Sequence, residues 1–235
     1  MKVILLILSF LPVVLLGLYI YSKDSDKEPK SLLFGLFVSG FLSALIVIFA
    51  NLFIVTFFPD FYVSSNYNRY SFLIIFLLIF LEMGVLEELS KWIMIMFIGF
   101  KNKEFDQIYD IIVYSVFVAL GFAAFENVFY VMQGGVGVGI YRAIFSVPGH
   151  AAFGVIMGYF LGLAKTSRSR SMRIWFMIFS VFFPAILHTV YNFCLIAETT
   201  PYLMMFIGFM IILYFIAFKR INEFANSNEV IDNSK

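Results

Sequence analysis

The sequence is poor in charge for its length. Only 13% of its 235 residues are Asp, Glu, Lys or Arg, against about 25% in an ordinary soluble domain, and 62% are hydrophobic. Its 16 basic and 15 acidic residues are too few to form the charged surface of a soluble domain of this size. A helical bundle in a bilayer needs charge only at its two rims. The net charge of +1 gives no reason to expect a nucleic-acid partner. We therefore expect an integral membrane protein, with the lipid bilayer as its solvent.

Cysteine and histidine are also scarce. The single cysteine, Cys194, excludes an internal disulfide and a metal site built from cysteines alone. We interpret it as a small apolar core residue. The two histidines, His150 and His188, both lie inside long apolar runs, which is an unusual place for a polar ring.

Long apolar runs account for most of the chain. A helical crossing of the bilayer takes about 20 residues, and suitable runs lie at residues 3–21, 31–57, 71–99, 109–131, 141–164, 174–197 and 202–218. The polar breaks between them are short, so we predict an all-α, polytopic membrane bundle of about seven transmembrane helices with antiparallel neighbours. The bundle is one domain over residues 1–218, with a polar cytoplasmic tail at 219–235. The first run is too long for a typical signal peptide and no Ala-x-Ala site follows it, so we expect it to be retained as a helix.

The distribution of Lys and Arg predicts the orientation. Eleven basic residues lie in alternate breaks and the tail: Lys23, Lys27, Lys30, Lys101, Lys103, Lys165, Arg168, Arg170, Arg173, Lys219 and Arg220. Three lie on the other side: Lys2, Arg69 and Arg142. This bias places the N-terminus outside and the C-terminus in the cytoplasm, as an odd number of spans requires.

The third apolar run contains a charged cluster near its middle, the sequence Glu87-Glu88-Leu89-Ser90-Lys91. An ionisable group at this depth costs at least about 2.5 to 3.5 kcal/mol on insertion scales. Glu88 and Lys91 are three residues apart and Glu87 and Lys91 four apart, so the lysine can neutralise one carboxylate on the same helical face. The other carboxylate is then left without a cation.

Three later runs also carry polar groups at membrane depth. Counted from the predicted outer end at 1.5 Å per residue, Glu126 and Asn192 lie about 8 Å deep, and His150 and His188 about 14 Å deep. These four side chains can therefore meet in one layer, and a tilted span or a water-filled cavity would bring the deeper Glu87 level with them. Each has an ordinary structural explanation alone, as an ion pair, a packing histidine or an amide that bridges helices. The combination on four successive helices favours a functional site.

Taken in order, four motifs resemble those of a known family: Glu87-Glu88-x-x-Lys91, Phe122-x-x-x-Glu126 followed by Asn127, His150 in a Gly-flanked segment, and His188-x-x-x-Asn192. They are similar to the motifs of the PrsW family of intramembrane proteases, in the superfamily of type II CAAX prenyl proteases and Abi proteins. The resemblance runs from Glu87 to Asn192. It implies a multi-pass protease of the bacterial cell membrane that cuts a single-span membrane protein, such as an anti-sigma factor, from the outer side.

The resemblance also implies roles for individual residues. Glu87 would activate water with Glu126 as its partner, and Glu88 would pair with Lys91. His188 and Asn192 would stabilise the oxyanion that forms during peptide hydrolysis. The chain departs from the CAAX enzymes at one position, since their second motif ends in His where this chain has Glu126. This departure favours PrsW over a prenyl-protein protease.

Two questions of mechanism stay open at this point. We favour a glutamate-type enzyme without a cofactor, because a buried Glu beside a second carboxylate suits the task of a general base. The alternative is a Zn²⁺ site formed by His150, His188 and Glu126 with water as the fourth ligand, although the sequence lacks His-Glu-x-x-His. Two other classes of function remain, a proton-coupled transporter with a carboxylate relay and a non-catalytic membrane scaffold. The oligomeric state and the substrate's identity are left open.

Overall fold

The computed structural model describes residues 2–59, 70–196 and 199–226. These residues are almost entirely helical and contain no strand, so the predicted all-α class is confirmed. The helices are α1 (Lys2–Lys23), α2 (Lys30–Phe57), α4 (Phe72–Ile79), α5 (Leu86–Ile98), α6 (Ile108–Tyr141), α7 (Val147–Thr166), α8 (Arg170–Ile196) and α9 (Thr200–Ala225), with π-helical segments η2 (Phe80–Val85) and η3 (Arg142–Ser146).

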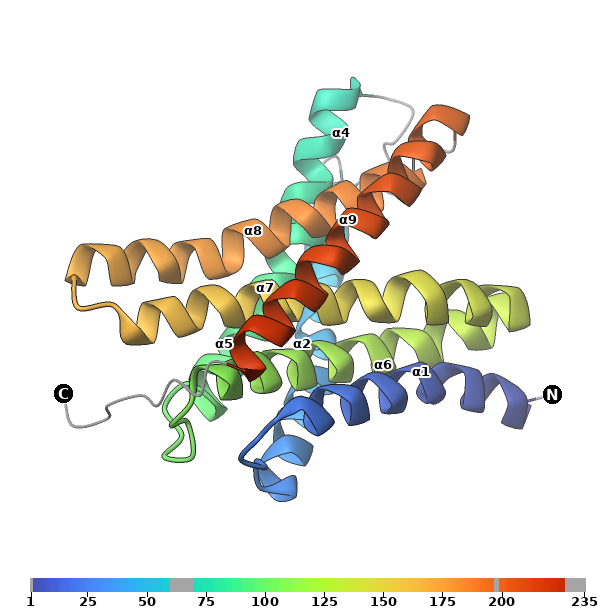
Figure 1. Ribbon diagram of the computed structural model, residues 1–235. Helices are drawn as coiled ribbons and strands as arrows, with labels where there is room; N and C mark the ends of the chain where they lie inside the picture. The colour runs from blue at the N-terminus through green and yellow to red at the C-terminus, as the bar shows by residue number, and fades with distance from the viewer. Residues whose placement is uncertain (1, 60–69, 197–198, 227–235) are drawn as a thin grey trace.

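A hairpin of α6 and α7 forms the centre of the bundle. The two helices run side by side in opposite directions, with α1 alongside α6 and α8 alongside α7 (Figure 1). In the most apolar window of residues 108–166, 89% of the residues are buried, against 22 to 39% in the other long apolar helices. The outer helices therefore present most of the surface to lipid and shield the polar groups of α6 and α7.

Glycines let α7 approach the backbone of α6 closely. A Cβ atom on Gly158 would lie 2.7 Å from the Cα of Ile112, and one on Gly154 would lie 3.0 Å from the carbonyl oxygen of Ser115. Small residues at i+4 steps allow this packing in membranes, where apolar side chains gain little by leaving lipid. This contact fixes the depth at which α7 side chains face α6.

The structure confirms one predicted break and corrects two other details of the predicted spans. Residues 133–139 were expected to form a break between two spans, and two helices meet there at a kink at Gly135, which has a φ of +75°, although α6 continues to Tyr141. The third span is not one α-helix, because η2 interrupts it between α4 and α5. Helix α9 reaches Ala225, so the first part of the predicted tail is helical, and residues 227–235 lie outside the described ones.

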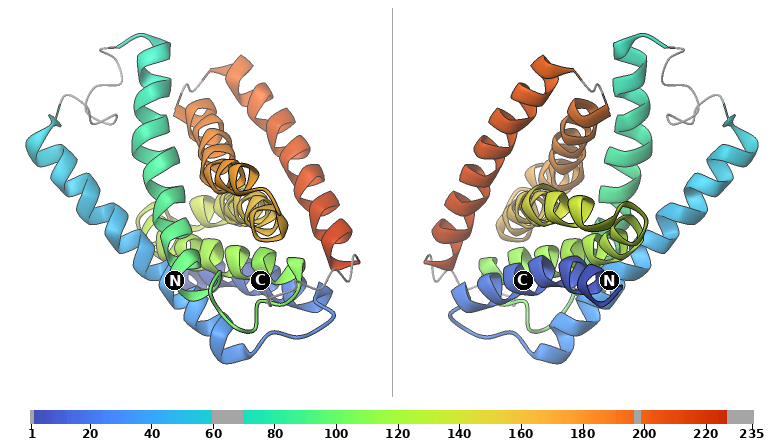
Figure 2. Two further views of the ribbon diagram at one scale, coloured as in Figure 1. Left: turned by 90° about the vertical axis from the view of Figure 1, so that its left-hand side faces the viewer. Right: turned by 90° about the vertical axis from the view of Figure 1, so that its right-hand side faces the viewer.

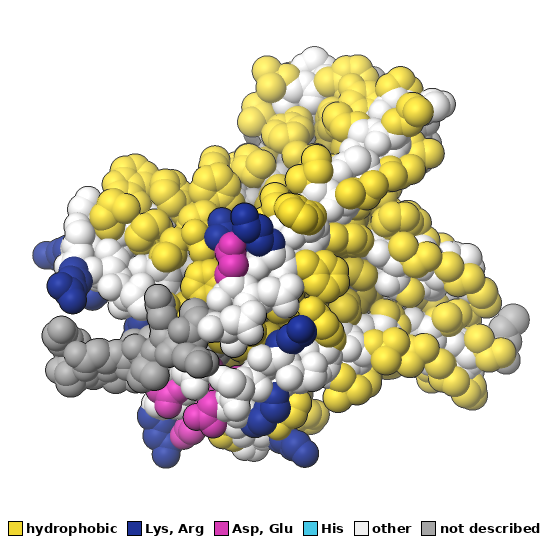
Figure 3. Space-filling view, in the orientation of Figure 1, with side chains coloured by type: hydrophobic (Ala, Val, Ile, Leu, Met, Phe, Trp, Pro, Cys, Tyr) yellow, Lys and Arg dark blue, Asp and Glu magenta, His cyan; other side chains and the backbone are white. Residues whose placement is uncertain are grey.

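The surface of the molecule is suited to a lipid bilayer. Helices α2 and α4 diverge toward one end of the molecule, where the first residues of α4 and α9 lie close together (Figure 2). In Figure 3, charged side chains gather on the left and lower parts of the face, whereas the upper and right parts are hydrophobic. Five helical stretches of the described chain are long and apolar enough to cross a membrane. They are compatible with a multi-pass protein, while the count of seven crossings stays a prediction. Cys194 is buried on α8, as expected.

Candidate active site

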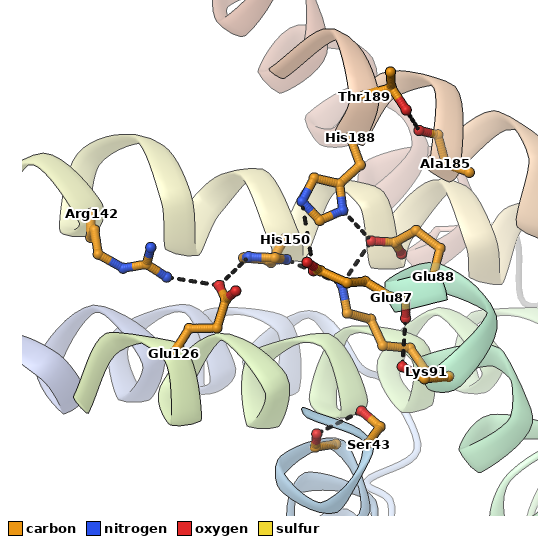
Figure 4. A network of polar contacts seen from close by, with 12 residues as sticks. Ser43, Glu87, Glu88, Lys91, Glu126, Arg142, His150, Ala185, His188 and Thr189 are labelled. Carbon is orange, nitrogen blue, oxygen red and sulfur yellow. Dashed lines mark hydrogen bonds and ion pairs between the residues drawn. The ribbon is translucent and has the colours of Figure 1, made fainter. Parts of the chain in front are cut away.

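Six of the predicted site residues come together inside the bundle. Helix α5 supplies three of them, and α6, α7 and α8 supply one each; they are Glu87, Glu88, Lys91, Glu126, His150 and His188. Figure 4 shows these side chains converging between the helices. The predicted meeting of these residues is thus present in the structure.

The π-helical segment η2 brings the start of α5 against α8. A Cβ atom on Gly84 would lie 2.5 Å from Thr189 Oγ1 and 2.6 Å from the carbonyl oxygen of Ala185, so only glycine fits here. That carbonyl accepts a hydrogen bond from Thr189 Oγ1 at 2.7 Å. Helix α8 continues through Pro184, which lacks the N–H group that would donate to the carbonyl oxygen of Ser180. Such π segments often occur at functional sites.

The carboxylate of Glu88 is held by two donors. Lys91 Nζ lies 2.7 Å from Glu88 Oε1, and both side chains are only 1% exposed. His188 Nδ1 lies 2.8 Å from the same oxygen. If Nδ1 carries the proton, Nε2 of His188 is left with a free lone pair. A buried ion pair of this kind needs its hydrogen bonds, because removing one partner leaves an uncompensated charge.

His150 links the ion pair to the next carboxylate. Lys91 Nζ lies 3.2 Å from His150 Nδ1, and His150 Nε2 lies 3.0 Å from Glu126 Oε2. Since an ammonium can only donate, the consistent tautomer accepts at Nδ1 and donates from Nε2 to Glu126. The ring therefore connects α5 to α6 through two hydrogen bonds of fixed direction.

Arg142 belongs to this network, although sequence reasoning counted it only as a rim charge. Its Nη2 atom lies 2.8 Å from Glu126 Oε2, and its Nε donates to Asn127 Oδ1 at 2.6 Å. Asn127 Nδ2 in turn donates to the carbonyl oxygen of Ser9 on α1 at 3.0 Å. The available signal was the position of Arg142 about two helical turns before His150. The guanidinium compensates the buried charge of Glu126.

Glu87 differs from Glu88 and Glu126 because no Lys or Arg of the described chain contacts its carboxylate. Its Oε2 atom is buried without a hydrogen-bond partner in the described part of the chain, and His188 Nε2 is 3.8 Å away. One ligand atom each from Glu87, His150 and His188 lie within 4.8 Å of one another. This carboxylate therefore faces both rings with one oxygen available to water, to a substrate or to a metal ion.

Comparison with known proteins identifies the family. Residues 28–218 match the family described as "PrsW family intramembrane metalloprotease". The chain belongs to the PrsW family. Three curated relatives are each named "Protease PrsW". That of Oceanobacillus iheyensis is 36% identical over 224 residues, or 94% of this chain and 95% of the relative. Those of Bacillus subtilis and Clostridioides difficile are 33% and 31% identical, and cover 89% and 98% of this chain and 90% and 95% of the relatives. No solved structure matches this one.

Membership of the PrsW family confirms the resemblance and makes this chain a multi-pass member of a family of intramembrane proteases. The match is wider than the motifs that indicated it, since it extends well before Glu87 and beyond Asn192. The match covers α2 to α8 and most of α9, and it includes the whole of the described polar network.

The residues present in this PrsW chain fit a metal ion, but with a different carboxylate from the predicted one. Glu87 groups with His150 and His188, whereas Glu126 is occupied by Arg142 and His150. Each histidine also has a carboxylate at a ring nitrogen, Glu88 at His188 Nδ1 and Glu126 at His150 Nε2. Metal-binding histidines commonly have such a partner on the second ring nitrogen.

Asn192 is the one predicted site residue that the network does not include. It lies on α8 one turn beyond His188 and is half-buried, and its side chain makes no hydrogen bond within the described residues. Aromatic rings frame the site instead. Phe153 stacks on His188 with centroids 5.0 Å apart, and the ring of Phe122 lies 4.2 Å from Lys91 Nζ. These rings exclude water from the ion pair and strengthen it.

Proposed function

We propose that this protein is an intramembrane endopeptidase in which Glu87 activates the water that attacks a peptide bond of a single-span membrane protein. The observation that carries the proposal is the difference between the glutamates. Glu88 and Glu126 are each bound by a Lys or Arg, while the carboxylate of Glu87 contacts neither among the described residues and has a buried oxygen 3.8 Å from His188 Nε2. A general base must have such an oxygen within reach of water.

The proposed reaction balances with Glu87 as the only group that takes up and returns a proton. Its carboxylate accepts a proton from water as the water oxygen bonds to the carbonyl carbon, which gives a tetrahedral oxyanion. When the C–N bond breaks, the protonated Glu87 returns the proton to the leaving nitrogen, and the products are a carboxylic acid and an amine. Lys91 and Glu88 hold the local charge fixed during both steps.

Asn192 is the proposed oxyanion donor, because its amide on the α8 face shared with His188 has no other hydrogen-bond partner among the described residues. His188 can add a second donor only when both ring nitrogens carry protons, since Nδ1 already faces Glu88. Loss of one oxyanion donor typically lowers kcat by about 10² to 10³. We expect Asn192→Ala to lower kcat with little change in KM, because the donor acts on the transition state.

A metal-dependent version rests on the same residues. Glu87, His150 and His188 would hold the ion, and His150 Nδ1 would exchange its hydrogen bond with Lys91 for the metal. A bound Zn²⁺ supplies a water ligand with a pKa near 7 and polarises the substrate carbonyl. In this version Glu88 and Glu126 orient the two rings from behind.

Glu87→Gln tests the assignment of the base. Glutamine keeps the size and hydrogen bonding of the side chain, so the purified variant should stay folded while cleavage of a single-span substrate falls by at least about 100-fold. Glu82→Gln is the matched control, because Glu82 is a second buried glutamate of the same span outside the described network. Cleavage by Glu87→Gln at the rate of the unmodified chain would refute the mechanism and favour the transporter interpretation.

Chelation separates the two chemistries. A metal-free enzyme keeps its activity after dialysis against a strong zinc chelator, whereas a site of Glu87, His150 and His188 loses activity and regains it with added Zn²⁺. Zinc content of the purified protein, measured before and after dialysis, gives a readout independent of turnover. His150→Ala and His188→Ala should abolish bound zinc in the metal version only.

The proposed orientation follows from the eleven to three charge bias and places the N-terminus outside. A reporter fused after Gln107 or Lys165 should read as cytoplasmic, and one near Gly135 as external. An external reading after Lys165 would reverse the orientation. With this topology the substrate would be cut from the outer side, as expected for a membrane-anchored anti-sigma factor.

A further inference from the structure

A groove on the outside of the bundle lies between α1, α2 and α6. It has a volume of about 400 Å³, and its lining includes none of the candidate active-site residues. Its floor contains Val13 and Leu120, which are buried, and its rim contains Val14 and Phe34, which are exposed. The walls are apolar for most of their length, so the groove suits a hydrocarbon chain.

The length of the groove matches one leaflet of a bilayer. Its lining along α1 begins at Phe10 and ends at Tyr21, which corresponds to about 16 Å of helix. The hydrocarbon core of a bilayer is about 30 Å thick, so the groove extends over about half of it. A transmembrane helix needs the full thickness to bury its apolar residues and does not match a groove of this length.

The polar part of the groove is confined to one end. Tyr21 and Lys30 both line the groove there, because α1 ends at Lys23 and α2 begins at Lys30. Lys30 is exposed and forms no ion pair with the described residues. The side chain of Lys27 lies nearby. Its ammonium donates a hydrogen bond to the carbonyl oxygen of Tyr21 at 2.6 Å and lies 5.0 Å from the centre of the Tyr21 ring.

The acidic neighbours of these lysines do not fully cancel their charge at neutral pH, because Glu28 keeps its proton there. Burial raises the pKa of Glu28 to about 8, despite a hydrogen bond from Tyr114. Burial also raises the pKa of Asp24. Asp26 is the exposed acidic residue between α1 and α2, whereas three lysines are exposed there: Lys23, Lys27 and Lys30. The end of the groove is therefore positively charged where lipid phosphates lie.

We propose that the groove binds an anionic phospholipid, with one acyl chain along α1 and the phosphate at Lys30. An apolar channel one leaflet long with a lysine and a tyrosine at its end matches the shape and charge of this lipid class. Basic residues near an anionic membrane surface contribute about 1 kcal/mol each. The site would couple the α1–α2 pair to the composition of the leaflet.

The charge part of the proposal is tested with purified full-length protein in mild detergent. Equal amounts of phosphatidylglycerol and phosphatidylcholine are added, and native mass spectrometry counts the lipids retained. The protein should retain phosphatidylglycerol preferentially, and Lys30→Gln should weaken this preference about fivefold, the factor that corresponds to about 1 kcal/mol. Lys101→Gln, at an exposed lysine outside the groove, should keep the preference. Equal retention of both lipids by the unmodified chain would overturn the proposal.

The groove itself is tested by filling it. Val14 lines the groove and is 51% exposed, whereas Leu11 on the same helix is 48% exposed and does not line it. Val14→Trp should therefore reduce the retention of both lipids several-fold, while Leu11→Trp should not. Because both positions are on the surface, both variants should unfold at the temperature of the unmodified chain. Equal lipid retention by the two tryptophan variants would show that lipid binds elsewhere.

Discussion

The described part of the chain contains two clusters of buried or partly buried acids, and their charges are compensated in different ways. The deep cluster holds Glu87, Glu88 and Glu126 among two histidines, Lys91 and Arg142. The rim cluster holds Asp24, Glu28 and Asp110, between the α1–α2 loop and the start of α6. In the deep cluster, cations and carboxylates form a network of ion pairs. In the rim cluster, the carboxyl groups mainly accept hydrogen bonds from neutral donors.

The rim cluster shows what burial does when, among the described residues, no cation forms an ion pair with the carboxyl groups. Glu28 Oε2 accepts a hydrogen bond from Tyr114 at 2.8 Å, and Asp110 Oδ2 accepts from the backbone N–H groups of Gln107 at 2.7 Å and Asp106 at 3.0 Å. Burial raises the pKa of Glu28 to about 8, and the nearby Asp110 and Asp24 add to the shift. A carboxyl in such a place stores a proton at neutral pH.

The comparison teaches that the deep cluster is arranged to keep charge in the bilayer. Lys91 and Arg142 each compensate one carboxylate, which leaves Glu87 as the deep glutamate without a direct cation contact. A cluster with a purely structural role would not require a glutamate without a cation. The proposed base, Glu87, is therefore the one glutamate of the deep cluster that is not paired with Lys91 or Arg142. The following predictions test the difference between the two clusters.

The largest effect is expected for loss of the deep cation. Lys91→Met leaves Glu88 buried with only His188 as a partner and should lower the free energy of unfolding by about 3 to 5 kcal/mol. Thermal unfolding in detergent measures the change. Lys27→Met is the rim control, because Lys27 is exposed and bonds backbone carbonyls, so it should cost about 1 kcal/mol or less. Equal losses in the two variants would remove the distinction between the clusters.

The next effect is expected at Arg142. Arg142→Gln removes a charge-assisted hydrogen bond to Glu126 and should lower the free energy of unfolding by about 1.5 to 3 kcal/mol. Cleavage should also slow, because Glu126 then holds His150 less firmly. Arg220→Gln breaks an exposed pair with Glu223 and should cost about 1 kcal/mol at most. An Arg142 variant as stable and active as Arg220→Gln would show that Glu126 needs no cation.

The smallest effect concerns the pH response of the rim cluster. The pKa of Glu28 is raised from its ordinary 4.5 to about 8 on folding, so its contribution to stability is complete below pH 4.5 and is lost as the pH rises through 8. Glu28→Gln cannot ionise and should lose less stability than the unmodified chain between pH 5 and 9. The expected difference is a few degrees in Tm. Parallel Tm curves across this range would show that Glu28 is ionised in both states.

The sequence by itself determined the solvent, the helical class and the set of polar residues at membrane depth. These follow from composition and from runs of about 20 apolar residues, which need no knowledge of packing. The ion pair of Glu88 and Lys91 was also predictable, because residues three apart on a helix lie on one face. The family resemblance could be identified from the same four motifs, since they stand in order along the chain.

Only the tertiary structure decided how these groups are paired. In the alternative metal site predicted from the sequence, Glu126 accompanies the two histidines, but the fold places Glu87 with them and Arg142 on Glu126. Such choices depend on differences of an ångström or two between side chains on different helices. Those distances follow from the close approach of α8 at Gly84 and of α6 at Gly158, and from the extra residue that a π segment inserts before Glu87. Helix periodicity does not contain these distances, because they are determined by contacts between helices.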